Sequence, residues 1–150
     1  MSENKEGQQQ VISVEQLLNE VERIRRSIDT LQSAILEVND SISAIASSKK
    51  VLEITKSQNQ IEALVTVDKK GYLIQRINGI ASNKVLVRLG SKYYAEVDID
   101  TALRILEKRE EELKRVSQSL QGELAKQLQY YNQLVEILNQ IQTQLQQRGE

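Results

Sequence analysis

Cysteine, histidine and proline are absent from this chain of 150 residues, and so are phenylalanine and tryptophan. The lack of cysteine excludes disulfide bonds and thiolate nucleophiles, and the lack of histidine excludes imidazole acid–base chemistry and the usual zinc sites. The remaining carboxylates and lysines form no recognisable catalytic pattern, and the sequence contains no P-loop. We therefore expect no enzyme activity, no metal and no cofactor.

Aromatic residues and glycines are scarce. Five tyrosines make up the aromatic content of 3%, and there are six glycines. A compact core of this size normally uses more aromatic side chains, so we expect apolar burial to be spread thinly along helices. The absence of proline and the low glycine content favour long, uninterrupted helices.

The sequence also lacks long apolar runs and a strong net charge. No run approaches the roughly 20 apolar residues that cross a bilayer. The first ten residues, MSENKEGQQQ, have no signal-peptide features and are expected to be flexible. A formal net charge of −1 argues against general nucleic-acid binding. These features predict a cytoplasmic protein without a membrane or nucleic-acid partner.

One apolar stripe predicts a first long helix over residues 11–57. From Val14 to Ile45 the apolar residues alternate in steps of three and four without a miss, which is typical of a coiled coil. The stripe continues through Lys49 to Leu52, and SQNQ at residues 57–60 is read as the end of the helix.

A second stripe predicts a helix over residues 98–147, capped by Asp98 or Asp100. Arg109 fills a gap in the stripe, and the steps between Leu120 and Tyr131 form an eleven-residue unit that relaxes the supercoil. The two stripes match in length and phase, which favours an antiparallel pair within one chain. The predicted stripe is Ala102, Leu106, Leu113, Val116, Leu120, Leu124, Leu128, Tyr131, Leu134, Leu138, Ile141 and Leu145.

Residues 62–97, between the helices, are read as two β-hairpins. Their turns are DKKG at residues 68–71 and Gly90-Ser91, and NGIASN at residues 78–83 is read as the loop between them. The fold class is therefore α+β. Such a small sheet has open edges and uncovered faces and is not stable alone, so we expect it to assemble with another subunit. The expected assembly residues are Val65, Val67, Leu73, Val85, Val87, Leu89, Tyr93 and Tyr94.

Three segments carry a resemblance to a known family. They are LVTVDKKGYLIQRI at residues 64–77, NKVLVRLGSKYYAEVDIDTAL at 83–103, and the helix that follows, ILEKREEELKR. With the long heptad helix before them, they resemble the alpha class of prefoldin subunits of the archaeal type. Beta-class subunits are similar but have one hairpin, so two hairpins indicate the alpha class.

The resemblance implies a hexamer of two alpha and four beta-class subunits whose strands form a β-barrel platform. It also implies an ATP-independent holdase that captures unfolded polypeptides and passes them to a group II chaperonin. Two alternatives remain open: a structural coiled-coil scaffold, and a prefoldin-like subunit of another complex.

The residues at the two chain ends are candidates for client binding. The segment EKREEELKR is charged except for Leu113, whereas Glu136 is the only charged residue from 127 to 147. An antiparallel pair brings this uncharged stretch together with the apolar start of the first helix, although such residues also widen an ordinary helix-pair core. The candidates are Val11, Ile12, Val14, Leu17, Leu18, Leu134, Val135, Ile137, Leu138, Ile141 and Leu145.

Overall fold

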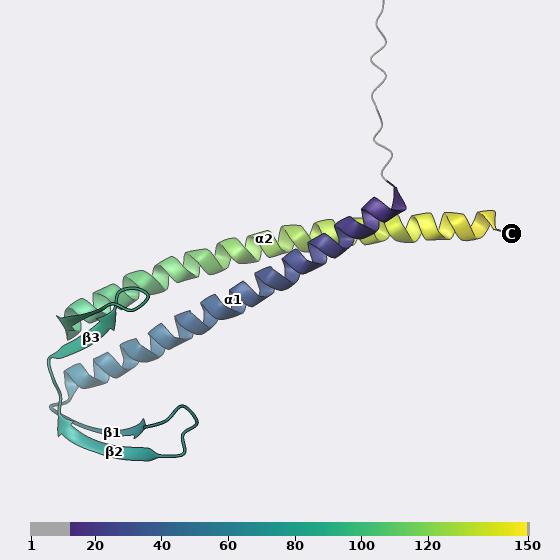
Figure 1. Cartoon of the computed structure of the whole chain (residues 1–150). Helices are drawn as coiled ribbons and strands as arrows, with labels where there is room; N and C mark the ends of the chain where they lie inside the picture. Colours follow the sequence, from purple (N-terminus) through teal and green to yellow (C-terminus); the bar gives the residue numbers. More distant parts are fainter. Residues whose placement is uncertain (1–12, 150) are drawn as a thin grey trace, which may run out of the picture. The chain divides into compact units, whose positions relative to one another are not determined.

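The computed structural model describes residues 13–149, in which two long helices flank four short strands in chain order (Figure 1). Helix α1 spans Val14–Ser57 and helix α2 spans Ile99–Arg148. The strands between them are β1 (Gln60–Thr66), β2 (Ile74–Ile80), β3 (Lys84–Arg88) and β4 (Tyr94–Asp98). This order of elements confirms the predicted α+β class with two hairpins between two helices.

The helices contribute to two compact units. The helical unit contains the described residues up to Leu36 and from Gln118 onward, and the hairpin unit contains Glu37–Ser117. The core of the helical unit brings early α1 residues against late α2 residues, which confirms the antiparallel pairing. Its buried members are Leu17, Ile24, Ile28 and Leu134.

Short side-chain contacts fix where each helix begins. The Ser13 hydroxyl accepts a hydrogen bond from the Gln16 amide at 3.1 Å, and the Gln16 side chain accepts one from the Ser13 amide at 3.0 Å. This reciprocal pair is a capping box. At α2, Asp98 accepts the backbone N–H of Thr101 at 2.7 Å, so Asp98 is the cap. Asp100 instead pairs with Lys56 at 2.5 Å.

The seam of α2, which is the row of its residues that faces α1, differs from the predicted stripe at two positions. Ser117 is 5% exposed whereas Val116 is 46% exposed, and Gln127 is half-buried whereas Leu128 is exposed. The seam therefore keeps its regular steps of three and four, and the predicted eleven-residue unit is wrong. The prediction followed apolar residues alone, but polar residues occupy these two seam positions.

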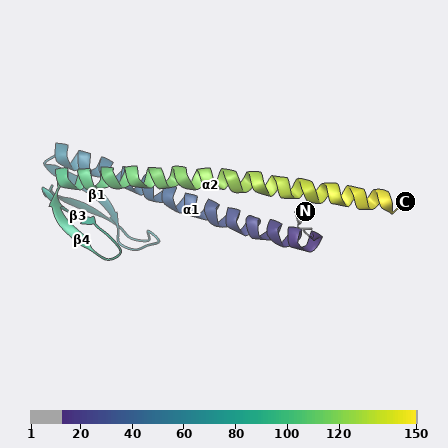
Figure 2. The same ribbon diagram turned by 90° about the horizontal axis from the view of Figure 1, so that it is seen from above.

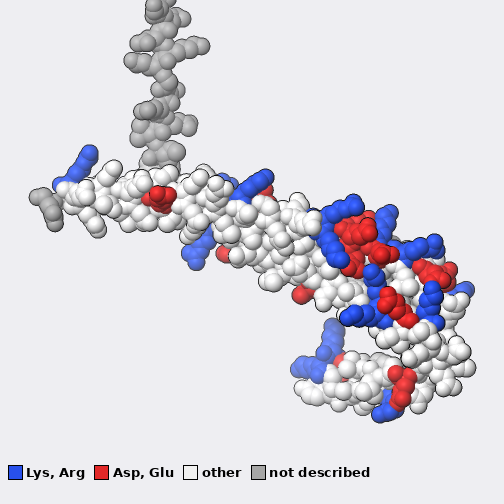
Figure 3. All heavy atoms as spheres, turned by 180° about the vertical axis from the view of Figure 1, so that it is seen from behind, with Lys and Arg blue, Asp and Glu red and all other residues white. Residues whose placement is uncertain are grey.

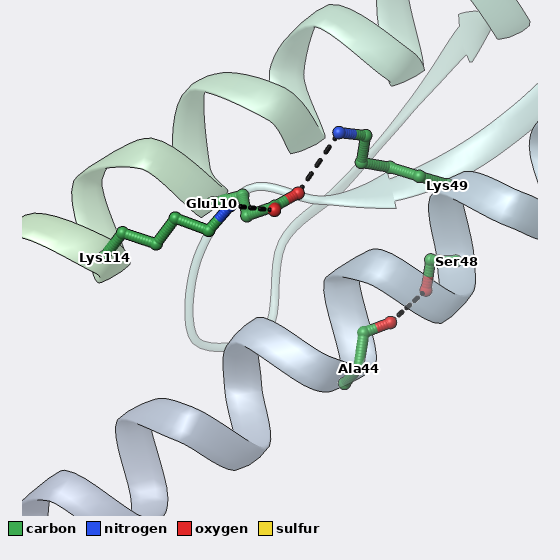
Figure 4. Close-up of polar contacts among 5 residues, drawn as sticks. All are labelled: Ala44, Ser48, Lys49, Glu110 and Lys114. Atoms are coloured by element: carbon green, nitrogen blue, oxygen red, sulfur yellow. Dashed lines mark hydrogen bonds and ion pairs between the residues drawn. The ribbon is translucent and has the colours of Figure 1, made fainter. Parts of the chain in front are cut away.

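A charged layer lies in the seam of the hairpin unit. Lys49 of α1 pairs with Glu110 of α2 at 3.1 Å, and Lys114 contacts the other oxygen of Glu110 at 2.6 Å (Figure 4). Glu110, with a side chain 13% exposed, thus fills the gap that was predicted for Arg109. The Lys114 and Lys49 ammonium groups hold the pKa of Glu110 below its usual value.

A second polar contact, from the Ser117 hydroxyl to the Asn39 side-chain oxygen at 3.0 Å, crosses between the helices in the same unit. Polar groups buried at single seam positions fix coiled-coil register, because a shifted pairing would leave them without partners. We interpret the two polar contacts of the hairpin unit as the features that set its register.

The strands form two separate antiparallel hairpins. In the first, β1 pairs with β2 from Gln60↔Ile80 to Thr66↔Ile74, and in the second, β3 pairs with β4 from Lys84↔Asp98 to Arg88↔Tyr94. The segment Asn78–Ile80, predicted as loop, belongs to β2, because it pairs with the start of β1. The first turn is organised by Asp68, whose carboxylate accepts the backbone N–H groups of Lys70, Tyr72 and Leu73.

The second hairpin packs on the helix ends nearest to it in sequence (Figure 2). Val87 of β3 joins Leu52 of α1 and Ile99 and Ala102 of α2 in a buried cluster. The alternation of side chains along β3 brings Val85 to the same face as Val87. This cluster is the core of the hairpin unit.

We predict that Ile24→Ala lowers the free energy of unfolding by about 2–5 kcal/mol, because it opens a cavity at a side chain that is 2% exposed. Leu36→Ala is the matched control on the same helix, since Leu36 is 67% exposed, and its effect should stay within about 0.5 kcal/mol. Urea unfolding followed by circular dichroism measures both, and equal effects would contradict the assigned seam.

The cap at Asp98 predicts a pH-dependent contribution to stability. The backbone N–H of Thr101 lowers the pKa of Asp98 from its usual 3.8, so its carboxylate stabilises the fold above about that pH. The contribution is lost as the pH falls through the lower pKa of the folded state. Asp98→Ala should therefore lower the melting temperature at neutral pH and make little difference in strong acid. Asp98→Asn keeps a capping acceptor, so its melting temperature at neutral pH should fall less than that of Asp98→Ala.

Candidate functional site

The first hairpin presents an apolar face that nothing in the described part of the chain covers. The register places Val65 opposite Gln75 and Ala63 opposite Ile77, so these four side chains share one face of the hairpin. Val65 and Ile77 are 41% and 48% exposed. An uncovered apolar face on a two-stranded sheet is typical of a protein–protein contact.

The same face extends into the turn. The Val67 amide donates to the Leu73 carbonyl at 2.9 Å, which continues the ladder beyond the two strands. Val67 and Leu73 are each 58% exposed. The structure therefore brings together four residues of one apolar surface, which we call the hairpin face: Val65, Val67, Leu73 and Ile77.

The assembly residues predicted in the second hairpin separate into two groups. Val87 is 6% exposed and belongs to the buried cluster, so it is not free for another subunit, whereas Val85 packs against the cluster and is partly buried. The helices cover this side of β3, a contact that the sequence pattern did not reveal. Leu89, Tyr93 and Tyr94 remain exposed around the second turn.

Sequence reasoning missed several exposed apolar residues of the two hairpins and their turns. Strand alternation was the available signal for Leu86, because it faces away from its neighbours Val85 and Val87 and is 70% exposed. In the first hairpin, the exposed residues could be found only with the correct strand bounds, because the sequence pattern assigned Ile80 to a loop. The missed residues are Leu64, Tyr72, Ile74, Ile77, Ile80 and Leu86.

In the helical unit, the predicted client-binding residues divide into core and surface. Leu17 and Leu134 are buried in the core between the helices, and Val135, Leu138 and Ile141 are partly buried. Val11 and Ile12 lie outside the described residues. The exposed candidates, which we call the end residues, are Val14 (45%), Leu18 (53%), Ile137 (45%) and Leu145 (61%).

The two parts of α2 differ in how many charged residues they contain. Residues 107–115, in the hairpin unit, are charged except for Leu113, whereas Glu136 is the only charged residue from 127 to 147. On the face drawn in Figure 3, charged side chains are crowded in one part of the chain and sparse toward its C-terminal end. On α1 the charges of the helical unit are partly neutralised by pairs within the helix, Glu20 with Arg23 and Glu22 with Arg26. Arg23 in turn lowers the pKa of Glu20.

Residues 13–149 contain neither a metal-binding group nor a membrane-spanning helix. No group of three acidic residues there is arranged to hold a metal ion. None of the described helices is long and apolar enough to span a membrane. The candidate sites are therefore two surfaces, the hairpin face and the end residues.

Comparison with known proteins identifies relatives of nearly the whole chain. A family model described as "Prefoldin subunit" matches residues 17–144. The chain is 47% identical to prefoldin subunit alpha of Saccharolobus solfataricus over 131 residues, which are 87% of this chain and 88% of that protein. It is 43% identical to prefoldin subunit alpha of Sulfurisphaera tokodaii over 144 residues, 95% of this chain and 94% of that protein.

A solved structure shares the fold. A chain of the filamentous PFD from Methanocaldococcus jannaschii matches with a TM-score of 0.64 at 20% identity, covering 79% of this chain and 97% of that chain.

We predict that Val65→Ser with Ile77→Ser reduces oligomer formation without unfolding the chain, because both side chains are already exposed in the single chain. Val87→Ser should instead destabilise the chain itself, since Val87 is buried. Size-exclusion chromatography with light scattering reports assembly, and circular dichroism reports folding. An unchanged oligomer in the double variant would contradict the role of the hairpin face.

Proposed function

Because the chain belongs to the prefoldin family of chaperone subunits, we propose that it is the alpha-class subunit of an ATP-independent holdase. In this proposal the helix ends capture unfolded polypeptides in the cytoplasm, and the complex passes them to a group II chaperonin.

The observation that carries the proposal is the set of end residues. Four large apolar side chains, Val14, Leu18, Ile137 and Leu145, are exposed in the helical unit, although each belongs to a helix with a well-formed seam nearby. Exposed apolar surface of this kind marks an interaction site. Because its contacts are non-directional, such a surface holds chains of many sequences reversibly.

The hairpin face supports the assembly part of the proposal. We propose that the hairpin face and the open strand edges join with beta-class subunits, two alpha to four beta, in a shared β-barrel. Assembly removes the open edges and covers the apolar faces. It also places several helix ends in one particle, so weak contacts at each end add through effective concentration.

The first test compares aggregation of a chemically denatured client, without ATP, in the presence of two variants of the assembled complex. The end variant carries Leu18→Ser, Ile137→Ser and Leu145→Ser. The control variant carries Leu36→Ser, Ile54→Ser and Val116→Ser, which remove three apolar side chains that are exposed elsewhere on the helices, by 67%, 54% and 46%.

We expect the control variant to suppress light scattering as the unmodified complex does, and the end variant to lose most of this suppression. No suppression by any well-assembled complex would overturn the holdase and favour a structural scaffold. Full suppression of aggregation by the end variant would support the holdase function but would show that clients bind at another surface.

A further inference from the structure

Charge is distributed unevenly along the chain. Residues 64–95, which contain both hairpin turns, include six lysines and arginines and one acidic residue, so their net charge is +5. The rest of the chain, with 14 basic and 20 acidic residues, has a net charge of −6. The net charge of −1 argues against general nucleic-acid binding, but it averages over this segregation. The hairpins are therefore a cationic segment of an otherwise acidic chain.

The lysines of the first turn have no acidic partner. Lys69 and Lys70 are both exposed. The only acidic residue in the range 64–95 is Asp68, and its carboxylate accepts three backbone N–H groups of its own turn at 2.8–3.3 Å. The carboxylate is thus held against the backbone, and none of the ion pairs found in residues 13–149 involves either lysine. Two ammonium groups therefore remain unpaired at this turn.

The second turn also has cations, and it contains no acidic residue. The Arg88 guanidinium donates to the carbonyl oxygens of Gly90 and Ser91 at 3.3 and 2.7 Å, which holds this cation over the turn. Lys92 is exposed, and the ion pairs of the described chain include neither cation. Charge at this turn is therefore balanced by water alone.

Exposed tyrosines accompany the cations of both turns. Tyr72 is 85% exposed and lies two residues after Lys70, and Tyr93 is 77% exposed and follows Lys92 directly. Lysines also protect the open edges of strands, but that role places them along the strands, whereas these lysines lie in the turns. An exposed ring beside a free cation is the combination that holds single-stranded nucleic acid, because the ring stacks on a base and the cation contacts a phosphate. We call the following six residues the turn residues: Lys69, Lys70, Tyr72, Arg88, Lys92 and Tyr93.

We propose that the turn residues bind single-stranded nucleic acid, with phosphates at the four cations and bases stacked on Tyr72 and Tyr93. This function goes beyond the proposed holdase and does not depend on it. Phosphate contacts carry no sequence information, and every base has a face that can stack. Binding is therefore independent of sequence and weakens as salt is added.

The test measures fluorescence anisotropy of a labelled oligo(dT) strand of about 20 nucleotides with the assembled complex of the full-length chain. We expect saturable binding. Its affinity should fall about 20-fold between about 0.05 M and about 0.2 M KCl, which is the loss expected for about three phosphate contacts to a single strand.

A pair of lysine variants assigns the phosphate contacts. Lys70→Gln with Lys92→Gln, one change in each turn, should weaken binding by about tenfold and reduce its salt dependence. The matched control, Lys50→Gln with Lys108→Gln, removes the same charge from exposed positions on the helices and should bind as the unmodified complex does. Circular dichroism and size-exclusion chromatography check that both variants fold and assemble.

Tyr72→Leu with Tyr93→Leu tests the stacking contacts. Leucine keeps an apolar side chain and removes the aromatic ring, so the affinity for oligo(dT) should fall by about tenfold. The salt dependence should stay the same, because the phosphate contacts remain. A polyglutamate peptide of the same length, which offers charge without bases, should bind more weakly than oligo(dT).

No binding of oligo(dT) by the assembled complex, or equal effects of the two lysine variants, would overturn the inference. Tighter binding of polyglutamate than of oligo(dT), unaffected by the tyrosine variant, would also overturn it and would identify the turns as a docking site for acidic polypeptide. None of these changes touches the end residues, so each variant should suppress client aggregation as the unmodified complex does. Failure of this inference is thus distinguishable from failure of the holdase.

Discussion

The antiparallel seam between α1 and α2 is the contact on which the rest of the structure depends. It contains apolar residues at nearly every position, from Leu17 and Ile24 in the helical unit to Leu52 and Ala102 in the hairpin unit. Apolar contacts alone do not fix how the two helices align. Polar residues at single positions, such as the pair of Lys49 and Glu110, set this register. Within the helical unit the seam brings the start of α1 against the later part of α2, and within the hairpin unit it holds β3 against both helices.

This arrangement explains why apolar surface remains available. A pair of helices buries one stripe on each helix, so apolar residues beside the stripe stay in water unless something else covers them. Leu18 on α1 and Ile137 on α2 are such residues, whereas Val14 and Leu145 belong to the predicted stripes but remain exposed near the helix ends. In the hairpin unit the helices cover one face of the second hairpin through Val87, and the first hairpin keeps its apolar face exposed. The two units thus each leave apolar surface exposed, on which the proposed assembly and the proposed capture of clients depend.

Much of the fold could be predicted from the sequence because its signals are local. The three–four spacing gives the helices, the Gly90-Ser91 turn gives the second hairpin, and Asp98 gives a helix start. The errors arose where a residue's place depends on a partner far along the chain. Ser117 occupies the seam because Asn39 accepts its hydrogen bond, and no pattern within α2 indicates this. Val87 is buried because both helices reach β3.

The candidate site was less predictable for the same reason. The sequence located the apolar ends of both helices but could not separate Leu17, which is buried, from Leu18, which is 53% exposed. That distinction needs the helix pair, since it depends on which side of α1 meets α2. The low charge of residues 127–147, by contrast, could be read directly from the sequence, because Glu136 is the only charged residue there.

The most direct test of this account is hydrogen exchange of the assembled complex with and without a bound unfolded client. Capture at the helix ends predicts that the client slows amide exchange in peptides covering residues 14–20 and 130–147 and leaves the four strands unchanged. Client-dependent protection confined to β1–β4 or to residues 107–115, with no change at the helix ends, would contradict it.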